Sequence, residues 1–188
     1  MAHDAVPTIP LRTLALDPGT RERGYAVLES TDLLYFGVHT FPHRCAARRL
    51  CAEGQRFVQR LLAAYAPKLL VMEKTWYAKS KRSTRLHIFV EAMERFAARL
   101  GLLVVAYTPR MVKKMICGHG DATKRDVADT LVRHYSYLAK YLRTDLRTQD
   151  KYWQSMFDAV ALGLTGYEKF SRAQVALTDV SNHGNDNA

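Results

Sequence analysis

The feature that most constrains the fold is a pair of short apolar runs near the start of the chain, each bounded by turn residues. Residues 14–16 deliver Asp17 into a Pro-Gly turn, and a second apolar run covers residues 24–28. Runs this short between Pro and Gly predict two paired strands rather than a helix. An ionised carboxylate at the tip of a buried strand needs a cation, a metal or water as a partner. Asp17 is therefore a candidate functional residue, although Asp can also be a simple turn former.

Two later apolar segments each carry an isolated acid. Residues 69–72 lead directly into Glu73, and the helical run 156–164 carries Asp158, which alone would be an ordinary helix acid. The three acids meet if the first and fourth strands are neighbours and the last helix crosses their ends. Carboxylate oxygens suit Mg²⁺ or Mn²⁺, and two such ions ~4 Å apart would hold both the attacking water and the leaving oxygen of a phosphodiester. The sequence therefore predicts a catalytic metal site.

The charge of the chain favours a polyanionic partner. The formal net charge is +10, and residues 74–85 contain five Lys or Arg and no acid, immediately after Glu73. A basic surface can be merely solvated, but this concentration beside a candidate catalytic acid favours nucleic acid.

Length and composition predict one domain with a hydrophobic core. With 188 residues, 48% of them hydrophobic, we expect a flexible leader at 1–11, a single domain at 12–170 and a disordered tail at 171–188, which has little apolar content. No apolar run is long enough to span a membrane and no signal peptide is visible, so we expect a cytoplasmic location. A zinc site built from the His and Cys residues is rejected because their spacing fits no zinc pattern; those residues are His39, His43, Cys45 and Cys51.

Periodicity predicts an α/β fold. We expect strands at 12–17, 23–29, 32–41, 68–73 and 102–107, and helices at 44–65, 86–100, 109–116, about 123–134 and 152–170. The segment 74–85 reads as a basic loop, and 135–151 has no clear assignment. This order predicts a mixed five-stranded sheet with helices on both faces. The apolar stripe at 86–100 can serve either the core or a dimer partner.

Four motifs together resemble the RuvC-type Holliday-junction resolvases. They lie at residues 14–25, 71–79, 108–126 and 158–165, in the family's order and spacing, and the resemblance covers roughly 12–168. It implies an RNase H-like fold with three antiparallel and then parallel strands, a homodimer, two Mg²⁺ or Mn²⁺ ions per active site, and paired nicks in four-way DNA junctions.

The resemblance also implies roles for individual residues. Asp17, Glu73 and Asp158 match the family's catalytic acids, and Trp76 matches its aromatic wedge, although Trp76 could instead be a core residue. Lys113 and Lys124 match the basic residues that touch phosphates. We expect further DNA contacts at Tyr77, Lys79, Lys81, Arg82 and Lys114, and dimer contacts at Phe89, Met93 and Phe96.

The chain departs from the family pattern at one position. Where the family has a second Asp or His one turn before its last acid, this chain has Ser155. Asp150, Asp145 or Gln154 could replace that ligand, as could Ser155 itself, or the ligand could be absent.

Other functions stay open from the sequence. Ser155 motivates a junction-binding protein with weak catalysis, and a related nuclease acting on other branched or hybrid nucleic acid is a further alternative. An ATPase of the actin and sugar-kinase type is rejected, because 188 residues are too few for the two domains that it requires.

Overall fold

The fold is built on one mixed sheet. The computed structural model describes residues 11–19, 22–41, 46–74, 81–142 and 147–183, with the side chains of 81–83, 147–151 and 177–183 outside that description. The strand order is β3-β2-β1-β4-β5, in which β1, β2 and β3 are antiparallel and β4 and β5 run parallel to β1. The strands are β1 (Arg12–Asp17), β2 (Glu22–Glu29), β3 (Asp32–Thr40), β4 (Leu69–Glu73) and β5 (Leu103–Tyr107). The predicted fold class is confirmed.

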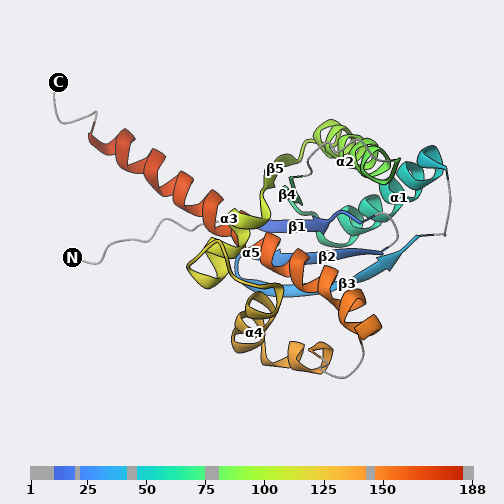
Figure 1. The fold of residues 1–188 in the computed structure, drawn as a ribbon. Helices are drawn as coiled ribbons and strands as arrows, with labels where there is room; N and C mark the ends of the chain where they lie inside the picture. Colours follow the sequence, from blue (N-terminus) through green and yellow to red (C-terminus); the bar gives the residue numbers. More distant parts are fainter. Residues whose placement is uncertain (1–10, 20–21, 42–45, 75–80, 143–146, 184–188) are drawn as a thin grey trace.

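Helices cover both faces of this sheet (Figure 1). One face carries α1 (Ala47–Tyr65) and α2 (Lys81–Arg99). The other face carries α3 (Pro109–Cys117), α4 (Lys124–His134), a short 3₁₀ helix η1 (Ser136–Tyr141) and α5 (Arg147–His183). Among the described residues, no helix has the combination of length and apolar character that crossing a membrane requires.

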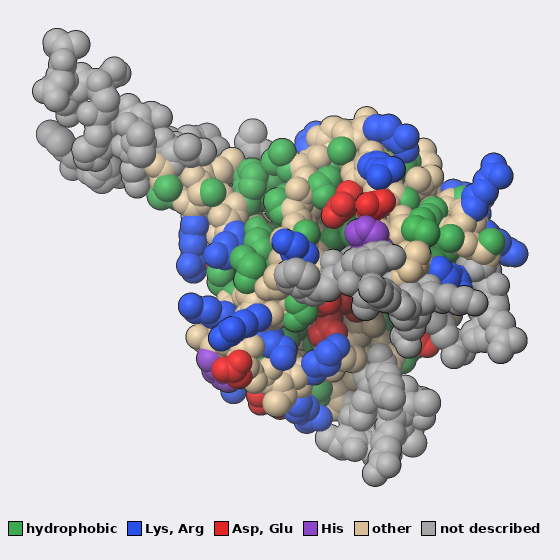
Figure 2. All heavy atoms as spheres, turned by 45° about the horizontal axis from the view of Figure 1, so that its top comes forward, with side chains coloured by type: hydrophobic (Ala, Val, Ile, Leu, Met, Phe, Trp, Pro, Cys, Tyr) green, Lys and Arg blue, Asp and Glu red, His purple; other side chains and the backbone are tan. Residues whose placement is uncertain are grey.

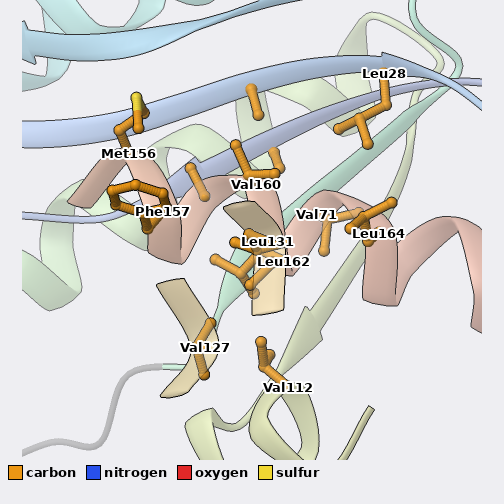
Figure 3. Close-up of a cluster of buried hydrophobic side chains, with 14 of the residues drawn as sticks. Leu28, Val71, Val112, Val127, Leu131, Met156, Phe157, Val160, Leu162 and Leu164 are labelled. Atoms are coloured by element: carbon orange, nitrogen blue, oxygen red, sulfur yellow. The ribbon is translucent and has the colours of Figure 1, made fainter. Parts of the chain in front are cut away.

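The alternation of side chains along β1 explains why its sequence is apolar throughout. Leu14 and Leu16 point into the core under α1 and α2, whereas Ala15 points into the core under α5, and all three are buried. Successive residues of a strand face opposite sides of the sheet, so a strand covered on both faces needs apolar residues at every position. Figure 3 shows the core on the α5 side, where residues from α5, α4 and the sheet meet.

Two predicted boundaries are wrong. The helix α2 begins at Lys81, so the predicted basic loop is partly helical, and α5 begins at Arg147 and continues to His183. The predicted disordered tail is therefore helical from 171 to 183, where it extends away from the body of the molecule (Figure 1). Low apolar content prevents packing but not helix formation, because this stretch has no Gly or Pro before Gly184, contains good helix formers and continues a helix already anchored in the core.

The structure contradicts two of the three predicted dimer contacts, whereas Phe96 stays a prediction. Phe89 and Met93 are 2% and 1% exposed and pack inside the protomer against α1 and the sheet. Phe96 is partly buried against the same core. Phe89 and Met93 therefore stabilise the protomer and offer no surface to a partner.

Candidate active site

Two of the candidate acids lie at the ends of neighbouring strands. Asp17 is the last residue of β1 and Glu73 the last residue of β4. These strands are parallel neighbours with Leu16 opposite Met72. Both strands therefore reach the same edge of the sheet, and the next residue of each is a carboxylate. The adjacency of the first and fourth strands, on which the predicted site depends, is confirmed.

The third acid, Asp158, comes from α5, and a glycine allows this helix to approach. Gly24 of β2 is paired with Asp17. A Cβ at Gly24 would lie only 1.6 Å from the carbonyl oxygen of Ser155, so no other residue type fits without displacing the helix. At this contact the Ser155 hydroxyl donates a hydrogen bond to the Asp17 carboxylate.

The three carboxylates affect one another electrostatically. Burial, and then the charges of Asp158 and Glu73, raise the pKa of Asp17 to about 8. Burial and the charge of Asp158 also raise the pKa of Glu73. Desolvated like charges disfavour the ionised form, so this cluster is stabilised by any cation that reaches it.

Lys124 is the cation that the chain itself supplies. Its Nζ lies 2.6 Å from Oδ2 of Asp158, and its charge lowers the pKa of both Asp17 and Glu73. The amide of Gln154 donates to the other Asp158 oxygen, Oδ1, at 2.9 Å. Both oxygens of Asp158 are thus held by neighbouring side chains.

The position of Lys124 is fixed by a capping box. Thr123 precedes α4, and its side chain accepts a hydrogen bond from the backbone N–H of Asp126 at 3.1 Å. The Asp126 carboxylate accepts from the backbone N–H of Thr123 at 2.7 Å, and these bonds lower its pKa. Reciprocal capping fixes the first turn of a helix. The backbone of Lys124, the first residue of α4, is therefore held in a defined position beside the acids.

The donor set fits a hard divalent cation by its chemistry. The groups that converge are three carboxylates without sulfur or imidazole, which suits Mg²⁺ or Mn²⁺. Across the described part of the chain, however, no three His, Cys, Asp or Glu side chains are close enough to ligate one ion. Asp158 is engaged with Lys124 and Gln154, so an ion would have to compete with the Lys124 ammonium for that carboxylate.

Comparison with known proteins identifies the family. The sequence model described as "Crossover junction endodeoxyribonuclease RuvC" matches residues 13–167. The chain belongs to the RuvC family. A RuvC of Synechococcus sp. (strain WH7803) is 29% identical over 162 residues, which cover 84% of this chain and 98% of the relative. A RuvC of Azorhizobium caulinodans is 32% identical over 122 residues, 62% of this chain and 72% of the relative. The predicted family and its enzyme class, an endodeoxyribonuclease, are confirmed.

Solved structures share the RuvC fold. Thermus thermophilus RuvC in complex with Holliday junction substrate aligns with a TM-score of 0.64 at 22% identity, covering 82% of this chain and 91% of that chain. The fowlpox virus resolvase, solved with substrate Holliday junction DNA, aligns with a TM-score of 0.53 at 19% identity, covering 84% and 99% of the two chains.

The basic residues assigned from the RuvC resemblance divide into two groups. Lys113 and Lys124 line a cavity of about 150 Å³ together with Glu73 and Asp158, whereas Lys114 is exposed on α3. Figure 2 shows acidic side chains near the middle of one face, with Lys and Arg side chains around them. The remaining predicted residues lie outside the described residues or side chains; they are Trp76, Tyr77, Lys79, Lys81, Arg82, Asp145 and Asp150.

Sequence reasoning missed the residues of an adjoining cavity. This space of about 270 Å³ lies beside Lys124 and Gln154, and its wall includes Arg125, Tyr141 and Trp153. The rings of Tyr141 and Trp153 are 4.5 Å apart between centroids. The abundance of Tyr and Arg in 135–151 was the available signal, but without periodicity it could not be assigned to an element.

Proposed function

We propose that this chain resolves four-way DNA junctions by metal-dependent hydrolysis of a phosphodiester at Asp17, Glu73 and Asp158. The main observation that supports this proposal is the convergence of these acids from two strand ends and a helix. Burial and mutual repulsion there raise the pKa values of Asp17 and Glu73. The names of the relatives, and two structures of the same fold that were solved with Holliday junction DNA, support the choice of substrate.

The three carboxylates would hold Mg²⁺ or Mn²⁺. A divalent ion held there would polarise the scissile phosphate and lower the pKa of its bound water, and a pair of ions would act on both the attacking and the leaving oxygen. Ser155 contributes a neutral hydroxyl where the RuvC family has an acid or His, and its hydrogen bond to Asp17 favours the ionised form of that carboxylate. Two ions therefore need a ligand from elsewhere, such as Asp150 or Asp145.

The basic side chains have distinct tasks. Lys124 is paired with Asp158 in the free protein, and its ammonium would become available to a phosphate if another cation bound that carboxylate. Lys113, on the same cavity wall, would contact the same strand. Gln154 is a positioning residue, because it fixes one Asp158 oxygen without reaching the reacting atoms itself. Trp76, Tyr77, Lys79, Lys81, Arg82 and Lys114 stay predicted DNA contacts.

Paired nicks imply two active sites. A four-way junction offers two symmetry-related strands, so a two-fold homodimer matches it with one site in each protomer. Light scattering of the free protein and of its junction complex at micromolar concentration tests this, and a monomer in both states contradicts it.

The central experiment compares substrates and acids together. Cleavage of a four-way junction, its matched duplex and an RNA–DNA hybrid is measured with Mg²⁺ or Mn²⁺ for the wild type, Glu73→Gln and Glu94→Gln. We expect cleavage of the junction alone, its loss by ~10³-fold or more in Glu73→Gln with junction binding retained, and wild-type rates in Glu94→Gln, since Glu94 lies on α2 away from the acids. Near wild-type cutting by Glu73→Gln contradicts the assignment.

A second function, junction binding with weak catalysis, is favoured by one observation. Ser155 supplies no charge, and Asp158 is already engaged with Lys124 and Gln154. A wild-type protein that binds junctions tightly but cuts them with neither metal, and that gains cleavage in Ser155→Asp, would establish this function instead.

A further inference from the structure

A groove lies on the face of the sheet opposite α5, between the edge strand β3 and α1. It consists of two adjoining cavities of about 610 and 500 Å³, which share His39 and Arg60 in their walls. The catalytic acids approach Ser155 of α5 on the other face, whereas the groove is bounded by Tyr25 and Phe57, which pack against the core under α1 and α2. The groove is therefore separate from the candidate active site.

A continuous series of aromatic rings forms its floor. The His39 and Phe57 rings are stacked with centroids 4.2 Å apart, and Phe57 meets Tyr25 at 5.0 Å. Tyr25 lies 5.3 Å from Tyr35, which stacks on Tyr65 at 5.5 Å. Burial, followed by the charges of Arg60 and Arg23, lowers the pKa of His39, so its ring is neutral at pH 7. The floor is a row of uncharged rings.

The edge strand is built to leave this row accessible. Gly37 lies between Tyr35 and His39 on the same side of β3, and a Cβ there would lie 2.7 Å from the Tyr25 hydroxyl oxygen. The absent side chain lets Tyr25 reach across the strand. Tyr35 remains 42% exposed, although it belongs to the ring series. Core packing explains Tyr25 and Phe57 but not this exposure.

Positive charge lines the rim. Arg56 and Arg60 are exposed on α1, and within the described residues neither forms an ion pair. The acid in the wall, Glu53, is already paired with Arg49 at 3.0 Å. The Arg60 guanidinium also lies 5.9 Å from the centre of the Phe57 ring. The rim thus offers two uncompensated guanidinium groups next to exposed aromatic surface.

We infer that this groove binds an unpaired nucleic-acid strand, with its bases stacked on the rings and its phosphates contacting Arg56 and Arg60. Sequence-tolerant binding of single strands combines these two elements, a row of aromatic side chains and a basic rim. A duplex hides the faces of its bases and can use only the rim. The inference goes beyond the proposed function, because it depends on neither the acids nor a metal.

The test is the affinity of a fluorescent oligothymidylate of about 15 nucleotides, measured by anisotropy in a chelator. Arg60→Glu is expected to weaken binding about tenfold or more, and Arg60→Ala to lower the slope of log affinity against log salt by about 0.7. Arg48→Glu is the matched control, since Arg48 is exposed on the same helix but outside the groove walls. Tyr35→Ala is expected to weaken binding about tenfold, whereas Tyr35→Phe keeps the ring and the affinity.

Three results overturn the inference. The first is that Arg48→Glu weakens oligonucleotide binding as much as Arg60→Glu does. The second is that Lys124→Ala weakens it as much as Arg60→Ala does, which would locate the oligonucleotide at the acids. The third is that a duplex competes for the groove as effectively as an unlabelled single strand. Circular dichroism excludes unfolded variants, and Tyr35→Phe keeps the ring test informative if Tyr35→Ala unfolds. Junction cleavage is assayed separately, so its absence with intact oligonucleotide binding contradicts only the proposed function.

Discussion

The two faces of the sheet achieve burial in different ways. On the α5 side the strands present the small residues Ala15 and Ala26 beside larger ones such as Leu28 and Val71, and Gly24 brings the helix backbone against β2. On the α1–α2 side they present large residues, and the Arg23 guanidinium is held between the Phe41 and Phe89 rings, 4.0 and 3.4 Å from their centres. Close contact of the backbones of α5 and β2 positions the turn that carries Asp158, whereas on the other face the spacing of helix and sheet is set by long side chains. The catalytic face is the one on which geometry is set by the backbone.

The largest effect is expected from removing a side chain on the α1–α2 face. Phe89→Ala leaves a cavity and loses the contact with Arg23, so the free energy of unfolding should fall by about 3–5 kcal/mol. Ile88→Ala, at the neighbouring 43% exposed position, should cost about 0.5 kcal/mol or less. Denaturant unfolding at several protein concentrations measures both. If Phe89→Ala and Ile88→Ala lower the free energy of unfolding equally, and both effects disappear at low protein concentration, Phe89 lies in a dimer interface instead.

A comparable loss with a different consequence is expected on the other face. Gly24→Ala places a methyl group against the Ser155 carbonyl, which is backbone and cannot rotate away, so we expect about 2–3 kcal/mol of destabilisation and loss of cleavage. Gly37→Ala is the matched control, because its new methyl group meets only the end of the Tyr25 side chain. Thermal unfolding and cleavage rates test the pair. Wild-type cleavage by Gly24→Ala would show that the backbone contact does not position Asp158.

Removing a buried charge should stabilise the catalytic face. The pKa of Asp17 is 3.8 in a model peptide and about 8 in the folded protein, so the unfolded chain loses its proton first as the pH rises. Stability is then fully present below about pH 4 and is lost progressively up to about pH 8. Asp17→Asn should raise the melting temperature by ~3 °C or more at pH 8 in a chelator and change it little at pH 4. A gain that is independent of pH would contradict the raised pKa.

The smallest effect on stability is expected at the capped start of α4. Lys124→Ala removes an ion pair in which the Lys124 side chain is 64% exposed and the Asp158 side chain 17% exposed, so solvent screens part of it and we expect a loss of about 1 kcal/mol. The same variant should lower the slope of log junction affinity against log salt by about 0.9. Lys140→Ala is a control, because Lys140 is exposed on η1 outside the cavities beside the acids. If both variants change the slope equally, Lys124 contributes only to the overall charge.

What could be predicted from the sequence was local. An acid that directly follows an apolar run is easy to recognise in a sequence, so Asp17 and Glu73 could be assigned to the ends of strands. In the structure these two strands are neighbours. Contacts between distant segments gave no such signal. Nothing in the residues around Gly24 indicates that Ser155 comes to rest on it, and the apolar stripe containing Phe89 reads the same whether it faces a core or a partner. The length of α5 was not predicted, because low apolar content was taken as a sign of disorder. A segment that does not pack against the core can still continue a helix.

That length has a mechanical consequence. From Asp158 to His183, α5 continues for 25 residues, or ~38 Å at ~1.5 Å per residue, and after Gly166 it contains neither Gly nor Pro. That outer part of α5 therefore lacks the residues that commonly kink a helix. Between it and Asp158 lie Gly163 and Gly166, which pack directly against the Leu28 and Val71 side chains of the sheet. A displacement of the outer part of α5 would therefore reach the turn that carries Asp158 through a segment that is held against the sheet.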